Sequence, residues 1–312
     1  MTILRSQIFI ISFLIVSILI IIFIISYFEC KNYKIKHYRI LNNKNDAHLR
    51  LIYISDFHNK MYRCNNDKLI KDILSQKSDY IFLGGDLIDF SALGEKFSVI
   101  KYENAISFLE KLSKSLAKNN ENSNYNLNRI FLSFGNHELR LKDSKNENLN
   151  IIFNEIIKEI ESFGICILDN ITFDLNENYT VSGMSLYKGY YANKFSRHKK
   201  HKNIDKEIFN KCYGNLDRDK FNIMLFHKPD YIEDFIDYGF DFVLSGHNHG
   251  GLIKFNGGCT LFSPDFDFMP KYNYGLYGFK GSSAIVTSGL GEHMIRIRVN
   301  NRPEFVVVDI NG

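Results

Sequence analysis

Short apolar runs alternate with longer mixed segments along most of the chain. Some of these runs have the length of buried strands, and a glycine, histidine, asparagine or aspartate closely follows each one. These runs are Leu51–Ser55, Tyr80–Leu83, Ile130–Ser133, Ile223–Phe226 and Phe242–Leu244. Apolar residues at helical spacing predict helices over Asn65–Gln76, 95–118 and 147–163. The alternation of strand-like and helical segments predicts an α/β domain.

The pattern changes after Gly164, where short extended runs replace the long helical one. These runs are Ile165–Leu168, Thr172–Leu175 and Tyr179–Gly183. They predict a second sheet that follows the first in the chain. Asn119–Asn128 is rich in asparagine and is predicted to be a polar loop.

The N-terminal segment Ile8–Phe28 contains no charged residue. As a helix it would be about 31 Å long, enough to cross the hydrocarbon core of a bilayer. A cleavable signal peptide is the alternative, but its apolar core is normally shorter and ends in small residues. Here the run ends in bulky aromatic residues and a glutamate. We therefore expect an uncleaved anchor over 1–30, a basic tether over 31–47 and a folded domain over 48–312.

Basic residues follow the apolar span and are sparse before it. Those that follow it are Lys31, Lys34, Lys36 and Arg39, whereas Arg5 precedes it. Because basic flanks stay on the cytoplasmic side, this predicts a single pass through the cell membrane with the following domain in the cytoplasm. The basic flank would lie close to anionic headgroups.

The composition fits one folded domain behind an anchor. With 312 residues and 45% hydrophobic content, the chain can bury one large core after the apolar N-terminal segment is set aside. A formal net charge of +4 is too modest to argue for nucleic-acid binding. The five cysteines are scattered and odd in number, so they form no recognisable disulfide framework.

Polar residues of a few chemical kinds follow the strand-like runs. The segments are Asp56-Phe57-His58, Gly85-Asp86-Leu87-Ile88-Asp89, Gly135-Asn136-His137-Glu138, His227 and Gly246-His247-Asn248-His249. Because open α/β sheets place their sites at strand ends, we expect these side chains to cluster. In an extended segment residues two apart point to the same side, which would bring Asp56 beside His58. The same spacing would direct His247 and His249 inward together.

The donor set restricts which metals fit. Carboxylate oxygen, amide oxygen and imidazole nitrogen suit Mn, Fe or Zn, and the set is too rich in nitrogen for a Mg or Ca cage. No cysteine belongs to it, which argues against a structural zinc or iron–sulfur site. Two divalent ions roughly 3.5–4 Å apart can clamp a phosphate and generate hydroxide at neutral pH. Asp86, at the end of its strand, is the natural bridge between them.

The ordered motifs D-x-H, G-D-x-x-D, G-N-H-[DE], H and G-H-x-H resemble those of calcineurin-like metallophosphoesterases. Among these, the chain is most similar to the small membrane-associated bacterial phosphoesterases of the YkuE and YaeI type. The closing segment from Val286 to Gly291 resembles the end of that branch. The resemblance covers residues 48–312. It implies a four-layer αββα sandwich, with two sheets between helices, behind an N-terminal transmembrane helix.

The resemblance also implies a role for each motif residue. One ion would be held by Asp56, His58 and His249, and the other by Asn136, His227 and His247, with Asp86 bridging both. His137 would act as general acid or stabilise charge on the phosphoryl oxygens. Asp89 would support the loop or orient the surroundings of His137. The implied reaction is in-line attack of metal-bound hydroxide on the phosphorus of a phosphate ester.

The anchor bears on the substrate class because it holds the site near the bilayer. We expect a metal-dependent phosphoric ester hydrolase acting on a lipid-linked phosphodiester or pyrophosphate. A phosphodiesterase for soluble nucleotides is the alternative enzyme. A non-catalytic membrane interaction module is the alternative from another class, but such a protein should have lost a motif residue and none is missing.

Some members of the branch work outside the membrane, which opposes the cytoplasmic orientation predicted from the basic residues.

The basic segment Tyr187–Lys202 contains lysines and an arginine among aromatic neighbours. It is either a solvated surface loop or a flap that recruits an anionic substrate. We expect no nucleic-acid partner, because no long basic stripe with interleaved aromatic residues lies outside this segment.

Overall fold

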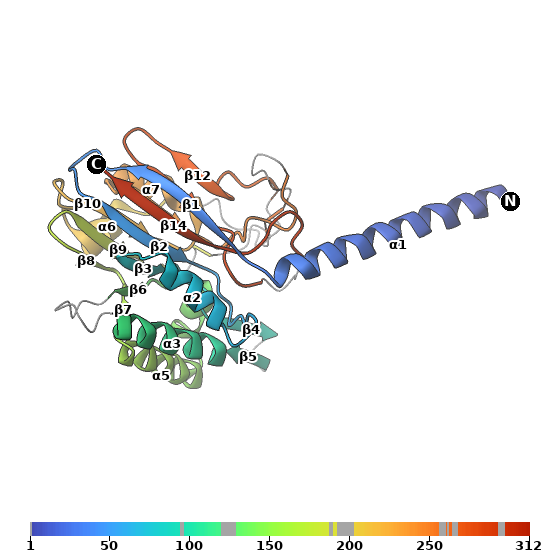
Figure 1. The fold of residues 1–312 in the computed structure, drawn as a ribbon, viewed down its shortest axis with the longest axis horizontal. Helices are drawn as coiled ribbons and strands as arrows, with labels where there is room; N and C mark the ends of the chain where they lie inside the picture. The colour runs from blue at the N-terminus through green and yellow to red at the C-terminus, as the bar shows by residue number, and fades with distance from the viewer. Residues whose placement is uncertain are drawn as a thin grey trace.

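Two six-stranded β-sheets lie face to face at the centre of the protein (Figure 1). The computed structural model describes residues 2–93, 97–119, 129–186, 190–191, 203–255, 260, 262–263, 268–292 and 297–312. The strands of the first sheet, in spatial order, are β1 (Lys34–Leu41), β14 (Glu304–Asn311), β2 (Leu49–Ile54), β3 (Tyr80–Leu83), β6 (Ile130–Leu132) and β7 (Cys166–Ile167). Those of the second sheet are β12 (Gly275–Gly278), β13 (Ser283–Val286), β11 (Phe242–Ser245), β10 (Phe221–Leu225), β9 (Tyr179–Gly183) and β8 (Ile171–Asp174).

The strands that lead into the predicted site run parallel. β2, β3, β6 and β7 pair in this way in the first sheet, and β9, β10, β11 and β13 do so in the second. Their carboxyl ends therefore meet at one edge of each sheet, which is where open α/β sheets hold their sites. Antiparallel pairs occur beside them, between β14 and β2 and at the edge strands β8 and β12.

Alternate residues along each strand enter different cores, because successive side chains point to opposite faces of a sheet. Leu51 and Tyr53 of β2 are fully buried in the core between the sheets, together with Ile223 of β10. Ile52 and Ile54 of β2 point the other way, into a core beneath helices. The order of layers is helices, sheet, sheet and helices, which confirms the predicted four-layer αββα sandwich.

Helices cover the outer face of each sheet. Those over the first sheet are α2 (Asp67–Ser75), α3 (Glu103–Asn119) and α5 (Glu147–Ser162). Those over the second are α6 (Lys206–Tyr213) and α7 (Ile232–Tyr238), the latter preceded by a short 3₁₀ turn, Pro229–Tyr231. The sequence predicted α2 and α5 with nearly these bounds. The predicted loop Asn119–Asn128 lies, beyond its first residue, outside the described residues.

A β-hairpin lies where the sequence predicted the start of a helix. β4 (Asp89–Leu93) and β5 (Phe97–Lys101) pair antiparallel, and α3 begins only at Glu103. The prediction of one helix over 95–118 is therefore wrong near its N-terminal end. Apolar and polar residues alternate at the start of β5, and this short strand period is hidden in a window long enough to detect a helix.

The segment expected as a tether contains an edge strand. β1 pairs in parallel with β14 along its whole length, from Lys34 beside Glu304 to Leu41 beside Asn311. This corrects part of the prediction of a tether over 31–47, because Lys34–Leu41 belongs to the folded sheet. The partner strand is the last one in the chain, and pairing over such a separation leaves no local pattern in the sequence.

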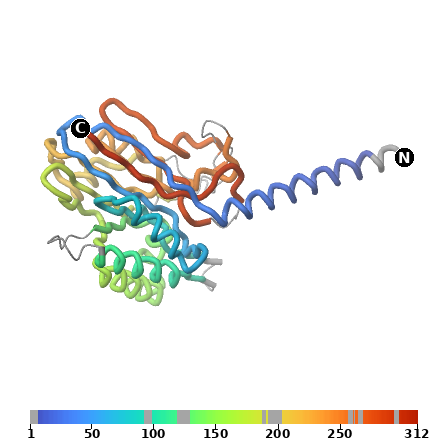
Figure 2. Tube along the Cα trace, viewed as in Figure 1, coloured from blue at the N-terminus to red at the C-terminus, as the bar shows by residue number. Residues whose placement is uncertain are grey.

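The N-terminal helix α1 (Thr2–Cys30) extends away from the domain (Figures 1 and 2). Within the described residues, its part Gln7–Cys30 is long and apolar enough, by length and composition, to cross a membrane. Large apolar side chains along α1 are exposed, whereas Ser26 and Cys30 near its C-terminal end are buried. The helix is therefore free along most of its length and packed against the domain only at its base.

Candidate metal centre

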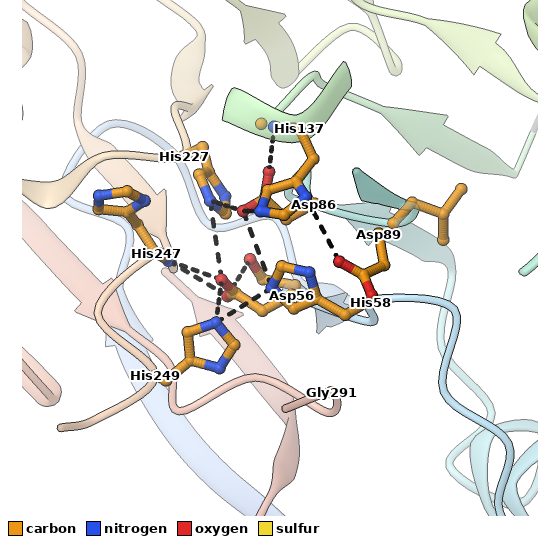
Figure 3. Close-up of polar contacts among 12 residues, drawn as sticks. Asp56, His58, Asp86, Asp89, His137, His227, His247, His249 and Gly291 are labelled. Atoms are coloured by element: carbon orange, nitrogen blue, oxygen red, sulfur yellow. Dashed lines mark hydrogen bonds and ion pairs between the residues drawn. The ribbon is translucent and has the colours of Figure 1, made fainter. Parts of the chain in front are cut away.

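Predicted site residues from both sheets meet at the carboxyl ends of the parallel strands (Figure 3). In chain order, Asp56 and His58 follow β2, Asp86 follows β3, His227 follows β10, and His247 and His249 follow β11. Asn136 and His137 occupy the first turn of α4 (Asn136–Lys142), which comes shortly after β6. The structure thus brings together residues that are spread over most of the sequence.

Left-handed backbone turns, rather than extended segments, aim several of these side chains into the site. The φ angles are positive at Asp56 (52°), His58 (46°), Asp86 (50°), His247 (66°) and His249 (49°). For a residue with a β-carbon this conformation costs about 1–2 kcal/mol, and it persists where the surroundings impose it. The extended geometry predicted for Asp56 with His58, and for His247 with His249, is therefore wrong. The side chains nevertheless converge (Figure 3).

Three overlapping groups of donor atoms could each hold a cation. The groups are Asp56, His58 and His249; His58, Asp86 and His137; and Asp86, His227 and His247, with the donor atoms of each group within 4.8 Å of one another. His249 Nε2 lies 3.3 Å from Asp56 Oδ1 and 3.1 Å from His58 Nε2. Asp86 Oδ2 lies 3.0 Å from His227 Nε2 and 3.8 Å from His58 Nε2. The Asp86 carboxylate therefore stands between the other donors.

Two buried atoms, Asn136 Oδ1 and His227 Nε2, are suited to bind a cation. Asn136 is 6% exposed, and its Oδ1 atom accepts no hydrogen bond from any described residue. A buried acceptor left unpaired costs about 1–3 kcal/mol, so a cation that binds oxygen is a suitable partner. His227 Nδ1 donates to the Gly84 carbonyl at 2.8 Å, so a neutral ring has its Nε2 lone pair directed at the Asp86 side of the site. The amide oxygen and the imidazole nitrogens complete a donor set suited to Mn, Fe or Zn.

Two buried carboxylates make the site strongly favourable for a positively charged group. Asp56 is fully buried and Asp86 is 2% exposed. Burial by itself would raise the pKa of Asp86, but the His227 and His137 imidazoles outweigh it and hold that pKa well below its usual range. Burial likewise opposes charge on His227, yet Asp86 and Asp56 raise the pKa of His227 to about 10. A proton on His227 and a divalent cation would therefore compete for the same place.

His137 faces the site from α4 (Figure 3). Its Nδ1 accepts a hydrogen bond from the Phe90 N–H at 2.8 Å, so the neutral ring carries its proton on Nε2. Nε2 lies 3.9 Å from Asp86 Oδ2 and can donate to a substrate oxygen there. Asp89 Oδ1 is 3.8 Å from Nδ1, beyond hydrogen-bonding distance. The Phe90 backbone, rather than the Asp89 carboxylate, therefore sets the orientation of the ring.

Glu138 holds two of the site loops together, a role that sequence reasoning did not assign. It is 2% exposed. Its carboxylate accepts the backbone N–H groups of Gly135 (2.9 Å), Asp86 (2.9 Å), Leu87 (2.7 Å) and Ile88 (3.1 Å). The loop after β3 is thereby fixed against the N-terminus of α4. The acidic last position of the G-N-H-[DE] motif is the sequence signal that could have pointed to this residue.

Glycines let neighbouring loops approach the two carboxylates closely. A β-carbon at Gly135 would come within 2.2 Å of Asp86 Oδ1, and one at Gly246 within 2.2 Å of Asp56 Oδ2. Both separations are far below van der Waals contact, so no larger residue fits at either position without moving the carboxylate. This explains the glycine that opens the G-N-H and G-H-x-H motifs.

Tyr191 packs against the site, where sequence reasoning had not placed it. Its ring packs edge-on against His247, with centroids 5.6 Å apart. Next to it, the Tyr190 carbonyl accepts a hydrogen bond from Lys228 Nζ at 3.1 Å. These two tyrosines are the described part of the basic segment Tyr187–Lys202, and the predicted flap otherwise lies outside the described residues.

The fold and the site together define a class of protein. Two stacked sheets between helices hold carboxylate and imidazole groups around a shared aspartate, which is an arrangement suited to metal-dependent hydrolysis of phosphate esters. The chain belongs to the calcineurin-like phosphoesterase family, whose profile matches residues 49–251. This confirms the resemblance found in the sequence motifs and the enzyme class that it implied.

Curated relatives at modest sequence identity are named as metallophosphoesterases or as a phosphodiesterase. The metallophosphoesterase YkoQ of Bacillus subtilis strain 168 is 23% identical over 256 residues, which cover 82% of this chain and 81% of YkoQ. The phosphodiesterase YaeI of Escherichia coli strain K12 is 25% identical over 274 residues, covering 85% of this chain and 83% of YaeI. The metallophosphoesterase YkuE of B. subtilis is 32% identical over 92 residues, which cover 30% of this chain and 32% of YkuE.

Proposed function

We propose that the protein hydrolyses a phosphate ester with two divalent cations, Mn, Fe or Zn. The observation that carries the proposal is the position of Asp86, whose carboxylate can act as a donor with His58 on one side and with His227 and His247 on the other. One cation would be held by Asp56, His58 and His249, and the other by Asn136, His227 and His247, with Asp86 between them. Overlapping groups of this kind suit a pair of cations roughly 3.5–4 Å apart.

The bound cations would supply Lewis-acid charge to the phosphoryl oxygens and activate water as the nucleophile. Side chains of the protein would donate the proton and contact the substrate. His137 keeps its proton on Nε2 because Phe90 N–H occupies Nδ1. It would give that proton to the leaving oxygen or stabilise charge on the phosphoryl oxygens. Tyr191, packed against His247, would form one wall of the substrate pocket.

The position of the site favours a substrate that resides in a membrane. The base of α1 and the His249 loop share one partner, Arg298, which donates from its backbone to Ser26 Oγ at 2.9 Å and from Nη1 to the His249 carbonyl at 3.4 Å. If α1 spans a bilayer, the site lies near its surface. We therefore propose a lipid-linked phosphodiester or pyrophosphate as substrate. The relative YaeI is named a phosphodiesterase, which supports a diester.

We further propose a single-pass protein of the cell membrane with its domain in the cytoplasm. α1 has the length and apolarity for a span, and the basic residues that follow it support this orientation. Backbone N–H groups of Arg298 and Asn301 bond to Ser26 and Glu29 in α1. Loss of α1 as a signal peptide would leave both donors unpaired. These contacts support retention of the helix.

Turnover of synthetic esters by the full-length protein in detergent tests the proposed function. With Mn²⁺, we expect hydrolysis of bis-p-nitrophenyl phosphate to exceed that of p-nitrophenyl phosphate. Asp86→Asn should lower turnover by about a hundredfold or more, because it weakens the carboxylate that lies between the two proposed cation positions. Asp67→Asn, at an exposed aspartate on α2, is the matched control. Turnover that needs no cation, or that survives Asp86→Asn, would contradict the proposal, and a chain that binds no cation would favour an interaction module.

A further inference from the structure

We infer that the last turn of α1 is a positioning element of the metal centre, acting through Arg298 and Asn301 on the loop that carries His249. The inference rests on the proposed function, because it concerns the cation assigned to Asp56, His58 and His249. It gives the N-terminal helix a role beyond attachment to a membrane.

The base of α1 is joined to a distant loop by two hydrogen bonds. The Arg298 N–H donates to Ser26 Oγ at 2.9 Å, and the Asn301 N–H donates to Glu29 Oε2 at 2.8 Å. Each pair is separated by 272 residues in the sequence. Ser26 is 2% exposed, so its bond is shielded from water, which strengthens it. The helix end therefore fixes the backbone from which both side chains project.

Arg298 extends this support to the loops around the site. Arg298 is 3% exposed. Its guanidinium donates to the carbonyls of Ser288 (2.8 Å), Gly291 (2.7 Å), Asn301 (3.2 Å) and His249 (3.4 Å). Its Nη2 also lies 3.2 Å from His249 Nδ1. A guanidinium is a rigid fork of donors with no acceptor, so it holds these groups at fixed positions relative to one another. Both the backbone and the ring of His249 thus rest on Arg298.

Asn301 and the loop after β13 also support the His249 loop and Asp56. Asn301 Nδ2 donates to the His249 carbonyl at 2.7 Å and also to the Gly251 carbonyl. The Gly291 N–H, next to a carbonyl that Arg298 binds, donates to the carbonyl of Asp56. Two of the three donors in this group, Asp56 and His249, therefore rest on contacts that lead to α1.

Two donors outside this group, Asp86 and His227, are supported from the opposite side of the site. Glu138 fixes the backbone of Asp86, and the Gly84 carbonyl fixes the His227 ring. Both contacts come from the β3 and α4 side of the site. Disturbing the base of α1 should therefore weaken one cation position much more than the other, whereas a general loss of folding would weaken both.

Titration calorimetry with Mn²⁺ on the full-length protein in detergent tests this difference. His227→Ala leaves the group with His249 as the intact one, and His58→Ala leaves the group with His227. With His227→Ala as background, we expect Glu29→Ala to weaken Mn²⁺ binding about ten- to a hundredfold, the usual effect of removing a partner that orients a ligand. With His58→Ala as background, the same change should be under about threefold. Glu29→Gln keeps an acceptor oxygen for Asn301 N–H and should restore binding.

A pair of serine variants provides an independent check. Ser26→Ala should reproduce the effect of Glu29→Ala, whereas Ser12→Ala, at an exposed serine of the same helix, should have none. Equal weakening in both backgrounds, or unchanged binding in Glu29→Ala, would overturn the inference. If Glu29→Ala fails to fold, Ser26→Ala decides by the same measurement. A protein that binds no Mn²⁺ at all would refute the proposed function, while two bound ions that ignore Glu29→Ala and Ser26→Ala would refute only the role of α1.

Discussion

At the scale of single residues, His227 shows how the site selects positive charge. Its ring is completely buried, which disfavours charge, yet it lies 3.0 Å from one carboxylate and 3.6 Å from another. The effect of the two carboxylates outweighs that of burial, and the pKa of His227 rises to about 10. Because Nε2 is also the proposed ligand atom, binding of a cation must release this proton.

We therefore expect cation affinity to fall as the pH is lowered through the neutral range. Below its raised pKa of about 10, His227 is protonated, and a cation that displaces one proton loses about tenfold in affinity for each unit of falling pH. Calorimetric titration with Mn²⁺ in buffers of different ionisation enthalpy counts the protons released. His227→Asn should release about one proton fewer. Affinity that does not change with pH would show that no such competition exists.

His137 is the residue whose effect should appear in catalysis and not in binding. We expect His137→Ala to lower kcat by about 10²–10⁴-fold, with Mn²⁺ affinity unchanged. If His137 is the acid, the loss is larger for an alkyl ester than for a p-nitrophenyl ester, because the poorer leaving group needs the proton more. Equal losses would indicate charge stabilisation instead. His48→Ala, at an exposed histidine, is the control, and an unchanged kcat in His137→Ala would remove the residue from the mechanism.

At the scale of elements, local pattern predicted helices better than it predicted turns. The apolar faces of α2 and α5 recur at helical spacing, and both helices lie where they were expected. The β4–β5 hairpin was missed because two short strands contain too few residues to establish a period. The left-handed turns at the candidate ligands were missed for another reason. Nothing in the residue types at Asp56 or His247 requires positive φ, and the surrounding contacts impose it.

The junction of β3 with α4 depends on Glu138, so its removal should be costly. Glu138→Ala would leave a cluster of backbone N–H groups buried without an acceptor, and each such group costs about 1–3 kcal/mol. We expect the free energy of unfolding to fall by at least about 3 kcal/mol, with loss of Mn²⁺ binding at the Asp86 position. Urea unfolding measures the first effect and calorimetry the second. Glu147→Ala, at an exposed glutamate on α5, should change neither. A Glu138→Ala protein as stable as the wild type would contradict the role of Glu138 in joining the two loops.

At the scale of the whole molecule, the N-terminal region is part of the fold. β1 pairs with β14 along its whole length, and Ile40 within it is buried in the core between the sheets. A protein that begins at residue 45 should therefore be less stable and more prone to aggregate than one that begins at residue 31, because it exposes the paired edge of β14. Thermal unfolding and size-exclusion chromatography compare the two. Equal melting temperatures would mean that β1 is dispensable.

The sequence by itself determined the chemistry of the site. The candidate donor residues, their order and the glycines beside them are specified by residue type at short spacing, so the motifs alone predicted a metal-dependent phosphoesterase. The four-layer architecture and the apolar N-terminal helix were predicted as well. The helix follows from an uninterrupted apolar run, which is a local property.

Only the tertiary structure decided how these parts are connected. It showed that Asp86 lies between His58 and His227, that Glu138 joins two loops and that β1 completes a sheet. It also showed that Arg298 bonds both to the base of α1 and to the His249 loop. Each of these features is a contact between residues far apart in the chain. Such contacts depend on packing and on hydrogen bonds formed only in the folded state, so no local pattern of residue types encodes them.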